Sequence, residues 1–217
     1  MEVTLKIPQP QPVFIDPADS ALVIVDMENE FLKPGGVHYM SGRAERAIGN
    51  LAPLLQRFRE AGSRVIYVQS LRAKTAPEFT IFQRPYYLQQ DTWAVEIVDE
   101  LKPLPGEPIV QKRSNDCFNH TTMESVLAEL DLVPGRSQIV VTGCATNGCV
   151  DCAVVGFSVR DYAVWVPEDC TASMSEEAEM QGYTHYFGLG YDHNVTSTRS
   201  NLIRIAVPSA VPSLVAV

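Results

Sequence analysis

The sequence predicts a three-layer αβα protein built on a mainly parallel sheet of about six strands. Two observations lead to this fold class. Short runs rich in valine and isoleucine alternate with helical patterns, and no repeat, low-complexity segment or linker interrupts them. Strands that alternate with helices form βαβ units, whose parallel sheets are covered by helices on both faces. We therefore expect residues 1–217 to form a single domain.

Each expected element has its own local pattern. The strands are short apolar runs such as Ala21–Val25. The helices repeat apolar residues every three or four positions, and Gly62 closes the first of them. In chain order we expect a strand at 21–25, a helix at 43–61, strands at 64–69 and 108–112, a helix at 121–130, a strand at 137–143, a helix from the next turn to about 160, a strand at 162–170, a helix at 175–186, and a short strand at 194–198 before a final helical turn.

Two stretches depart from this alternation. Residues 71–92 are aromatic and irregular, and a loop of that length is usually a binding or lid element. Residues 206–217 are apolar and uncharged. They either pack on a neighbouring surface or form an end without a role.

The composition argues against several classes of function. With 17 Lys and Arg against 26 Asp and Glu, the net charge is −9 and no basic cluster offsets it, so we expect no nucleic-acid partner. The apolar runs are too short to span a bilayer, and the N-terminus has no signal-peptide pattern. We therefore expect a cytoplasmic protein with no membrane partner. Its five cysteines should be reduced, because their number is odd and their spacing fits no disulfide framework.

Three of the cysteines, Cys144, Cys149 and Cys152, crowd into one strand-to-helix transition. Thr146 or Asn147 can cap the helix, which places Cys149 in its first turn. Free N–H groups and the helix dipole favour a thiolate there, and the same groups can form an oxyanion hole. The other two thiols lie at the strand end and one turn deeper, where burial is the usual role. Cys149 is therefore the candidate nucleophile.

Two charged residues stand at the ends of other strands. Asp26 follows the first apolar run, and Lys112 ends the strand at 108–112. Each has an ordinary alternative, since Asp26 could cap a turn and Lys112 could be a surface lysine. Ligands bind beyond the carboxyl ends of parallel strands, so we expect the acid, the cation and the thiol to converge.

The three residue types suit acyl transfer to cysteine followed by hydrolysis. An ammonium beside a thiolate lowers the thiol pKa. A carboxylate can take the thiol proton and return it to a leaving amine. This chemistry requires no metal and no organic cofactor, and its partners are a small-molecule substrate and water.

Other interpretations of the cysteines stay open at this point. Cys149 and Cys152 have the spacing of a dithiol redox motif, although redox chemistry does not require the two charged residues. With Cys144 and Cys170 they also fit plant-type iron–sulfur spacing, but a strand that runs into a helix lacks the irregular loop such a cluster needs. A protein that only binds a ligand is a third possibility.

At these residues the sequence resembles the isochorismatase-like cysteine hydrolases. This superfamily includes nicotinamidases, N-carbamoylsarcosine amidases, ureidoacrylate amidohydrolases and biuret hydrolases. Three motifs carry the resemblance and span most of the chain: ALVIVDMENEF at 21–31, IVQKRSNDCFNHT at 109–121 and VVTGCATNGCV at 140–150. The resemblance implies a Rossmann-like fold and a homo-oligomer, either a dimer or a tetramer.

The resemblance also implies roles for particular residues. The triad of the family falls on Asp26, Lys112 and Cys149. The cis peptide of the family falls between Cys144 and Ala145, and the N–H groups of Ala145 and Cys149 would form the oxyanion hole.

Departures from the family pattern narrow the expected activity. Isochorismatases proper lack the cysteine, so Cys149 implies amide cleavage. Metal-containing nicotinamidases carry Asp and His after the second strand, where this chain reads QSLRAKT, and its four histidines are scattered. We therefore expect no metal site. Glu28 stands where many relatives have glutamine, which alters the charge of the pocket.

The stretch KRSNDCFNHT resembles ureidoacrylate amidohydrolases and implies a ureido or carbamoyl substrate, such as ureidoacrylate, biuret, triuret or an N-carbamoyl compound. Its hydrolysis would release ammonia or carbamate, and a maleamate- or nicotinamide-type carboxamide is the alternative substrate. The candidate substrate contacts are Asn29, Arg72, Tyr86, Tyr87, Phe118, Asn119 and Tyr191. Each tyrosine could instead serve core or loop packing, and Arg72 could be a surface residue. The sequence assigns no role to Cys117, Cys144, Cys152 or Cys170.

Overall fold

The central sheet of the molecule has the predicted parallel arrangement. The computed structural model describes residues 9–188 and 193–206. In spatial order the sheet contains β4 (Ile109–Lys112), β3 (Arg64–Ser70), β2 (Ser20–Val25), β5 (Gln138–Cys144), β6 (Ala163–Pro167) and β8 (Val195–Thr198), and the short β7 (Thr171–Ala172) pairs with β5. Every pair in this sheet is parallel, which confirms the prediction of a mainly parallel sheet of about six strands.

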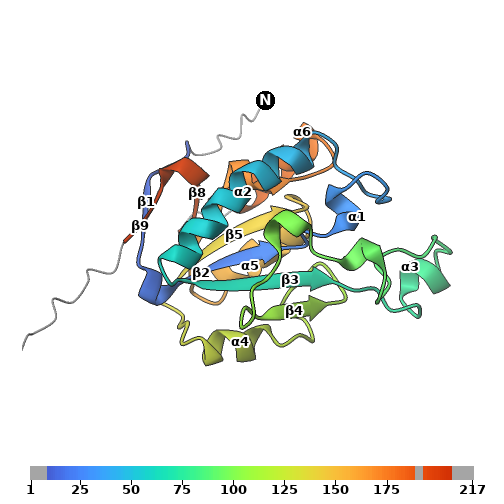
Figure 1. The fold of residues 1–217 in the computed structure, drawn as a ribbon, viewed down its shortest axis with the longest axis horizontal. Coiled ribbons are helices and arrows are strands. Elements are labelled where there is room, and N and C mark those ends of the chain that lie inside the picture. Colours follow the sequence, from blue (N-terminus) through green and yellow to red (C-terminus); the bar gives the residue numbers. More distant parts are fainter. Residues whose placement is uncertain (1–8, 189–192, 207–217) are drawn as a thin grey trace, which may run out of the picture.

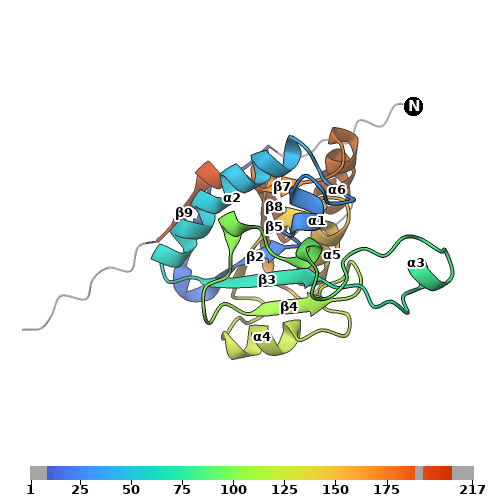
Figure 2. The same ribbon diagram turned by 45° about the vertical axis from the view of Figure 1, so that its right-hand side comes forward.

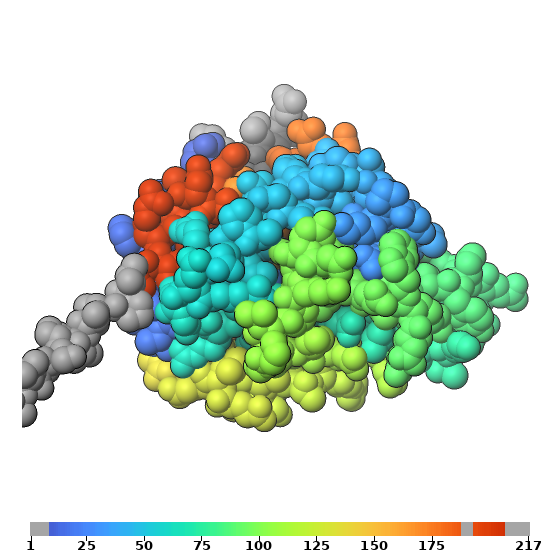
Figure 3. All heavy atoms as spheres, in the orientation of Figure 1, coloured from blue at the N-terminus to red at the C-terminus, as the bar shows by residue number. Residues whose placement is uncertain are grey.

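Helices cover both faces of the sheet and complete the three-layer αβα fold (Figure 1). One face is covered by α2 (Arg43–Glu60), whose buried residues pack on alternate side chains of β2 and β3. The other face is covered by α4 (Met123–Glu129), α5 (Cys149–Ser158) and α6 (Glu176–Gly188). Successive residues of a strand point to opposite faces, so the buried strands supply both cores. The space-filling view shows α2 lying across its face of the molecule (Figure 3).

The longest helix matches its sequence pattern closely. The apolar positions of α2, which include Leu51, Leu54, Leu55 and Phe58, are fully buried on one face. The chain then turns at Gly62, which has a φ of +73° that most residues avoid. The expected helix at 43–61 is therefore confirmed within one residue of its end.

The predicted strand at 162–170 is too long. It ends at Pro167, and residues Glu168–Cys170 form a short 3-10 turn before β7. The strand ends there because polar side chains bond elsewhere. Glu168 accepts a hydrogen bond from the Ser197 hydroxyl, and Asp169 accepts hydrogen bonds from the N–H and the hydroxyl of Ser200. These side-chain bonds hold the turn and cannot be deduced from the apolar pattern.

Several short elements lie outside the predicted set. A separate two-stranded parallel sheet joins β1 (Val13–Ile15) to β9 (Ile203–Ile205), near the two ends of the described chain. The helix α1 (Asn29–Leu32) follows the end of β2. Short 3-10 turns at 17–19, 93–95 and 99–101 are also additional, whereas the 3-10 turn at 200–202 is the expected final helical turn.

Residues 71–92, here called the arm, are the irregular loop that the sequence indicated. The arm contains only the short helix α3 (Pro77–Thr80), and it projects from the strand ends (Figure 2). Directly after α3, Ile81 and Phe82 are each 70% exposed. Among the described residues, no helix is long and apolar enough to cross a membrane. Tyr191 and all but the first residue of the 206–217 tail lie outside the described residues.

Candidate active site

The three residues that the sequence placed at strand ends come together in the structure. The Lys112 ammonium lies 2.8 Å from Asp26 Oδ2 and 3.1 Å from Cys149 Sγ. The Asp26 and Lys112 side chains are both 0% exposed, whereas Cys149 is partly accessible. A buried carboxylate and ammonium in direct contact form an ion pair whose charges act through a low dielectric. The lysine is the link between the acid and the thiol.

The backbone at the end of β2 places the Asp26 carboxylate in this cluster. Asp26 has a φ of +51°, in the left-handed region that aspartate tolerates better than most residues. Its carbonyl oxygen accepts a hydrogen bond from the Cys144 thiol at 3.0 Å. Beside it, Gly143 has a φ of +115°, and a Cβ there would lie 2.0 Å from the Val25 carbonyl oxygen. Glycine thus allows the end of β5 to approach the end of β2.

A serine that the sequence analysis missed connects the charged residues. The hydroxyl of Ser70 donates to Asp26 Oδ2 at 3.0 Å and accepts from Lys112 Nζ at 2.6 Å. Lys112 also donates to the Ser114 carbonyl oxygen at 3.1 Å. Ser70 and Lys112 are directly paired in the β3–β4 register. The signal that could have found Ser70 is its place at the carboxyl end of a strand next to the one that ends in Lys112.

The turn before α5 presents the Cys149 sulfur and two free backbone donors. The Cys144–Ala145 peptide bond is cis, as the resemblance implied. The Ala145 carbonyl oxygen accepts hydrogen bonds from the N–H groups of Gly148 and Val150. The N–H groups of Ala145 and Cys149 donate to no other described residue, so they are available to a bound oxygen.

The predicted N-cap of this helix is wrong. Gly148 occupies the cap position and has no side chain to bond, while Cys149 is the first residue of α5. Asn147 instead accepts a hydrogen bond from the Ser173 hydroxyl at 2.7 Å and donates to Gln181 at 3.2 Å. The Thr146 hydroxyl is buried and makes no hydrogen bond among the described residues. The turn is therefore held by contacts to other parts of the chain.

The pKa of the Cys149 thiol is raised in the structure, whereas the sequence led us to expect a lowered one, so we expect a protonated thiol in the free protein. Burial raises its pKa, the Asp26 carboxylate adds to the rise, and Lys112 only partly opposes these effects. Burial alone would lower the pKa of Lys112, but Asp26 and Cys149 outweigh it, so the lysine stays charged. The sequence indicates a cation near the Cys149 thiol, but it does not show how completely the fold excludes water from the site. Here a base is needed to remove the thiol proton.

The raised pKa predicts slow alkylation of Cys149 at neutral pH. Below the pKa the thiolate fraction grows about tenfold per pH unit, so the rate with iodoacetamide should rise by about that factor per unit. The rate is measured by mass spectrometry of the peptide that contains Cys149. A rate that stays constant between about pH 6 and pH 9 would show that the thiol is already ionised.

A glycine on α6 lets that helix pack directly on the turn. A Cβ at Gly182 would lie 2.5 Å from the Thr146 carbonyl oxygen and 3.1 Å from the Asn147 Cα. These neighbours are backbone atoms, so an added methyl group must push the turn and the helix apart. Gly182 was not among the sequence-predicted residues, because the contact joins distant segments. Gly182 thus lets α6 lie close to the backbone of residues 146 and 147, between the two free N–H groups in the sequence.

We expect Gly182→Ala to lower kcat/KM by about tenfold or more, since displacements of about 1 Å at a reacting centre have effects of this size or larger. Overpacking of this kind also costs about 1–3 kcal/mol of stability. The matched control is Gly49→Ala in α2, where a Cβ would meet nothing within 4 Å. The control should keep its activity, and its free energy of unfolding should rise by about 0.5–1 kcal/mol. Steady-state kinetics and urea unfolding of both variants make the comparison, and equal activity in the two would contradict it.

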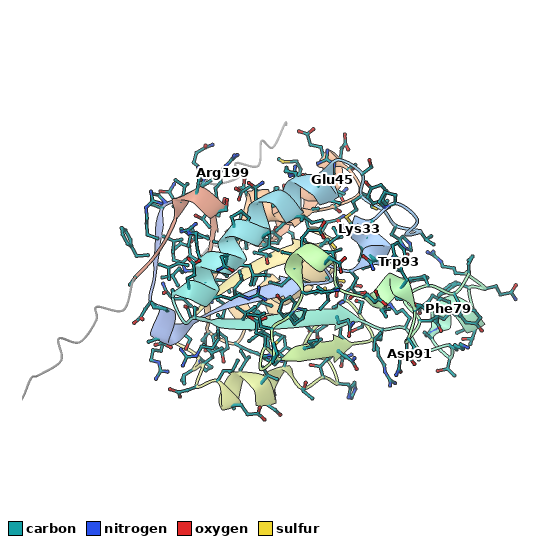
Figure 4. The ribbon with its side chains drawn as sticks, in the orientation of Figure 1. Lys33, Glu45, Phe79, Asp91, Trp93 and Arg199 are labelled. Carbon is teal, nitrogen blue, oxygen red and sulfur yellow. The ribbon has the colours of Figure 1, made fainter. Side chains whose placement is uncertain are left out.

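Four of the predicted substrate contacts lie in or beside the arm. Asn29 is 7% exposed and donates to the Trp93 carbonyl oxygen at 2.9 Å, and Arg72 donates to the Arg113 carbonyl oxygen. Tyr86 is 59% exposed and packs edge-on against Phe79, as does Tyr87. Figure 4 shows Phe79 on the projecting arm and Trp93 closer to the body. These side chains have packing or backbone partners, and their contact with a substrate stays a prediction.

The remaining predicted contacts are placed differently. Phe118 lies in the core, edge-on to Phe157 and with the Arg160 guanidinium 3.9 Å from its ring centre. Its ring has packing partners, and its contact with a substrate stays a prediction. Asn119 is exposed. Tyr191 lies outside the described residues. An unpredicted neighbour is Asn115, whose Oδ1 is 3.6 Å from the Cys149 sulfur.

The other four cysteines have no disulfide partner. Cys117, Cys144 and Cys170 are buried, and burial raises their pKa values; that of Cys117 rises to about 12. Cys152 is partly exposed and is also free.

A dithiol redox motif depends on a thiol of lowered pKa, which is the opposite of the shift at Cys149. Among the described residues, no three His, Cys, Asp or Glu side chains are grouped as metal ligands would be.

The fold and the cluster define the class of the protein: a Rossmann-like αβα domain whose candidate site joins an aspartate and a lysine at the ends of parallel strands to a cysteine at the start of a helix. The chain belongs to the isochorismatase family, because the isochorismatase domain matches residues 20–199.

Individual relatives agree with this family. The ureidoacrylate amidohydrolases RutB of Rhizobium rhizogenes and Agrobacterium fabrum are each 30% identical over 207 residues, covering 83% of this chain and 82% and 89% of theirs. An isochorismatase-like hydrolase from Alkaliphilus metalliredigens has a similar structure, with a TM-score of 0.74, 25% identity, and coverage of 84% of this chain and 96% of its own. The N-carbamoylsarcosine amidase from Thermoplasma acidophilum matches with a TM-score of 0.70, 26% identity, and coverage of 84% and 97%.

Proposed function

We propose that this chain is a cysteine-dependent amidohydrolase that cleaves a C–N bond of a small carbamoyl or ureido substrate. Its membership of the isochorismatase family and its ureidoacrylate amidohydrolase relatives make it a hydrolase of C–N amide bonds. The observation that carries the finer proposal is the Lys112 ammonium, which lies 2.8 Å from Asp26 and 3.1 Å from the Cys149 sulfur. These are the acid, the cation and the nucleophile of covalent amide hydrolysis.

The first half-reaction transfers the acyl or carbamoyl group to the sulfur. Asp26 accepts the thiol proton as the Cys149 sulfur attacks the carbonyl carbon, and a C–S bond forms. The negative charge on the former carbonyl oxygen is met by the free N–H groups of Ala145 and Cys149. The C–N bond then breaks, and Asp26 returns the proton to the departing nitrogen, so that the amine leaves neutral.

The second half-reaction restores the thiol. Water attacks the thioester or thiocarbamate carbon, with Asp26 taking one of its protons. The C–S bond breaks, and the proton passes to the sulfur, which regenerates Cys149 and releases the acid or carbamate. A carbamate decomposes to ammonia and carbon dioxide. The protons and the bonds balance without another reactant.

Lys112 has an electrostatic role in both half-reactions. It is the cation that touches both Asp26 and the sulfur, so it stabilises whichever of the two carries negative charge. Ser70 and the Ser114 carbonyl oxygen accept its other hydrogen bonds and fix its position. Because the site is buried, such a fixed charge acts more strongly than it would in water.

The names of the relatives guide the choice of substrate. The curated relatives are ureidoacrylate amidohydrolases, and one structural relative is an N-carbamoylsarcosine amidase. Both names describe a carbamoyl group on nitrogen, which favours a ureido or carbamoyl substrate over a simple carboxamide. Nicotinamidase from Bacillus subtilis also shares the fold, at 21% identity.

The proposal is tested by the release of ammonia from a panel of amides. The panel contains ureidoacrylate, biuret, triuret, N-carbamoyl amino acids, nicotinamide and maleamate. We expect the highest kcat/KM on a ureido or carbamoyl compound and no turnover by Cys149→Ala. A preference for nicotinamide or maleamate would replace the substrate proposal and leave the mechanism intact. Turnover that persists without Cys149 would refute the mechanism.

A further inference from the structure

A second carboxylate lies beside the cluster and has no place in the mechanism. Glu28 follows Asp26 by two residues and is 0% exposed. Its Oε1 accepts the backbone N–H of Ser70 at 2.6 Å. Its Oε2 is buried and, like Asp26 Oδ1, has no hydrogen-bond partner among the described residues. Asp26 contacts the Lys112 ammonium through its other oxygen, whereas the other oxygen of Glu28 meets a backbone N–H. A buried charged oxygen without a partner is costly, so the state of this carboxyl requires an explanation.

The charges around Glu28 do not favour a carboxylate. Asp26 from the end of β2 and Glu30 from α1 are acidic, and the Cys144 thiol of β5 is neutral. Lys112 is the cation that faces Glu28 from β4, and it already bonds to Asp26 and to the Cys149 sulfur. One buried cation cannot balance two carboxylates and a sulfur that becomes negative during turnover.

We propose that Glu28 carries a proton at neutral pH and acts as a positioning residue for the cysteine site. This role rests on the proposed function, because it is exerted on Asp26 and Lys112. Oε1 is occupied by the Ser70 N–H, so the proton resides on Oε2. Burial and the neighbouring Asp26 raise the pKa of Glu28 well above its ordinary range, which agrees with this assignment.

Glu28 acts through Ser70. Its Oε1 holds the Ser70 backbone, and the Ser70 hydroxyl in turn bonds to both Asp26 and Lys112. The neutral acid therefore fixes the hydrogen bond that joins the base to the cation. A neutral Glu28 also does not attract the Lys112 ammonium, which therefore stabilises only Asp26 and the Cys149 sulfur. An ionised Glu28 would compete for that charge and weaken the ion pair.

Protonation is tested by unfolding, without any assay of activity. In the unfolded chain a glutamate has its ordinary pKa of 4.5, whereas the folded protein keeps the proton to a higher pH. Above pH 4.5 folding therefore takes up a proton, and stability is lost as the pH rises toward the folded pKa. Glu28→Gln has no such proton. We expect the unfolding constant of the native protein, relative to that of Glu28→Gln, to rise about tenfold per pH unit through this range.

The positioning role is tested by kinetics with two variants. Glu28→Met removes the acceptor for the Ser70 N–H, so we expect kcat to fall by about tenfold or more with little change in KM. Glu28→Gln keeps an acceptor oxygen for the Ser70 N–H, so it should retain most of the kcat of the native protein. In the native protein kcat should decline on the alkaline side as Glu28 ionises, and Glu28→Gln should lack that decline.

The outcomes separate the two proposals. Parallel pH dependence of unfolding in the native protein and Glu28→Gln would show that Glu28 is ionised, and would overturn this inference whatever the enzyme hydrolyses. Equal kcat in the native protein and a folded Glu28→Met would overturn the positioning role. Absence of turnover on every amide would remove the proposed function, while the unfolding result would still decide the protonation of Glu28.

Discussion

Replacement of Cys149 by alanine is expected to abolish amide hydrolysis, with kcat/KM falling by about 10,000-fold. The proposed covalent route depends on this sulfur, which forms a hydrogen bond with Lys112 at 3.1 Å at the start of α5. The fold should be unaffected, because alanine removes only a partly accessible sulfur. Kinetics on the best substrate of the panel, with circular dichroism as a check of folding, measure the effect.

Cys152→Ser is the matched control for this variant. It removes a thiol one turn further along α5 that is also free and partly exposed. We expect it to keep activity within about twofold, since surface and near-surface substitutions usually have small effects. Loss of activity in both variants would favour the dithiol redox motif over the amidohydrolase. Activity retained in Cys149→Ala would contradict the role of Cys149 directly.

Replacement of Asp26 by asparagine has the second largest expected effect, a fall in kcat/KM of about 1,000-fold. The amide has nearly the same shape but cannot take the proton from a thiol whose pKa is raised by burial. It also leaves the Lys112 charge buried without its carboxylate, which costs about 3–5 kcal/mol when one partner of a buried pair is removed. Unfolding in urea must therefore accompany the kinetics.

The control for Asp26→Asn is Glu100→Gln. This change also converts an acid to its amide, but in an exposed ion pair with Lys33. Exposed pairs contribute about 0–1 kcal/mol, so activity and stability should hardly change.

If Asp26 and Lys112 act as one unit, the double variant Asp26→Asn with Lys112→Met should be no slower than the worse single variant. If the losses of transition-state stabilisation in the two single variants instead add up in the double variant, the residues act independently.

The sequence predicted the parts of the site that follow from strand ends. Asp26 and Lys112 lie at such ends and Cys149 begins the helix that follows β5, and parallel strands bring these positions to one edge of the sheet. Ser70 was missed because its strand was expected to end at Gln69 and because a hydroxyl leaves no apolar pattern. The close packing of Gly182 on Thr146 joins distant segments, and local patterns do not report such contacts.

The departure at Cys149 has a physical cause, which is burial. The cysteine pKa was expected to be low because a lysine was near, but desolvation of the site outweighs that charge. Phe118 lies in the core, where Gly156 leaves room for its ring: a Cβ there would lie 2.7 Å from that ring, and contact of Phe118 with a substrate stays a prediction. How deeply a group is buried depends on the whole fold, so the sequence identifies the reactive groups better than their ionisation.

The most direct test of the account is the mass of the enzyme during turnover. The protein is mixed with its best ureido or carbamoyl substrate, quenched in acid within the first turnovers, and analysed as the intact chain and as peptides. We expect one added carbamoyl or acyl group on the peptide that contains Cys149, and no added group in Cys149→Ala. Turnover with no covalent species, or with the group on another residue, would contradict a mechanism that passes through the sulfur of Cys149.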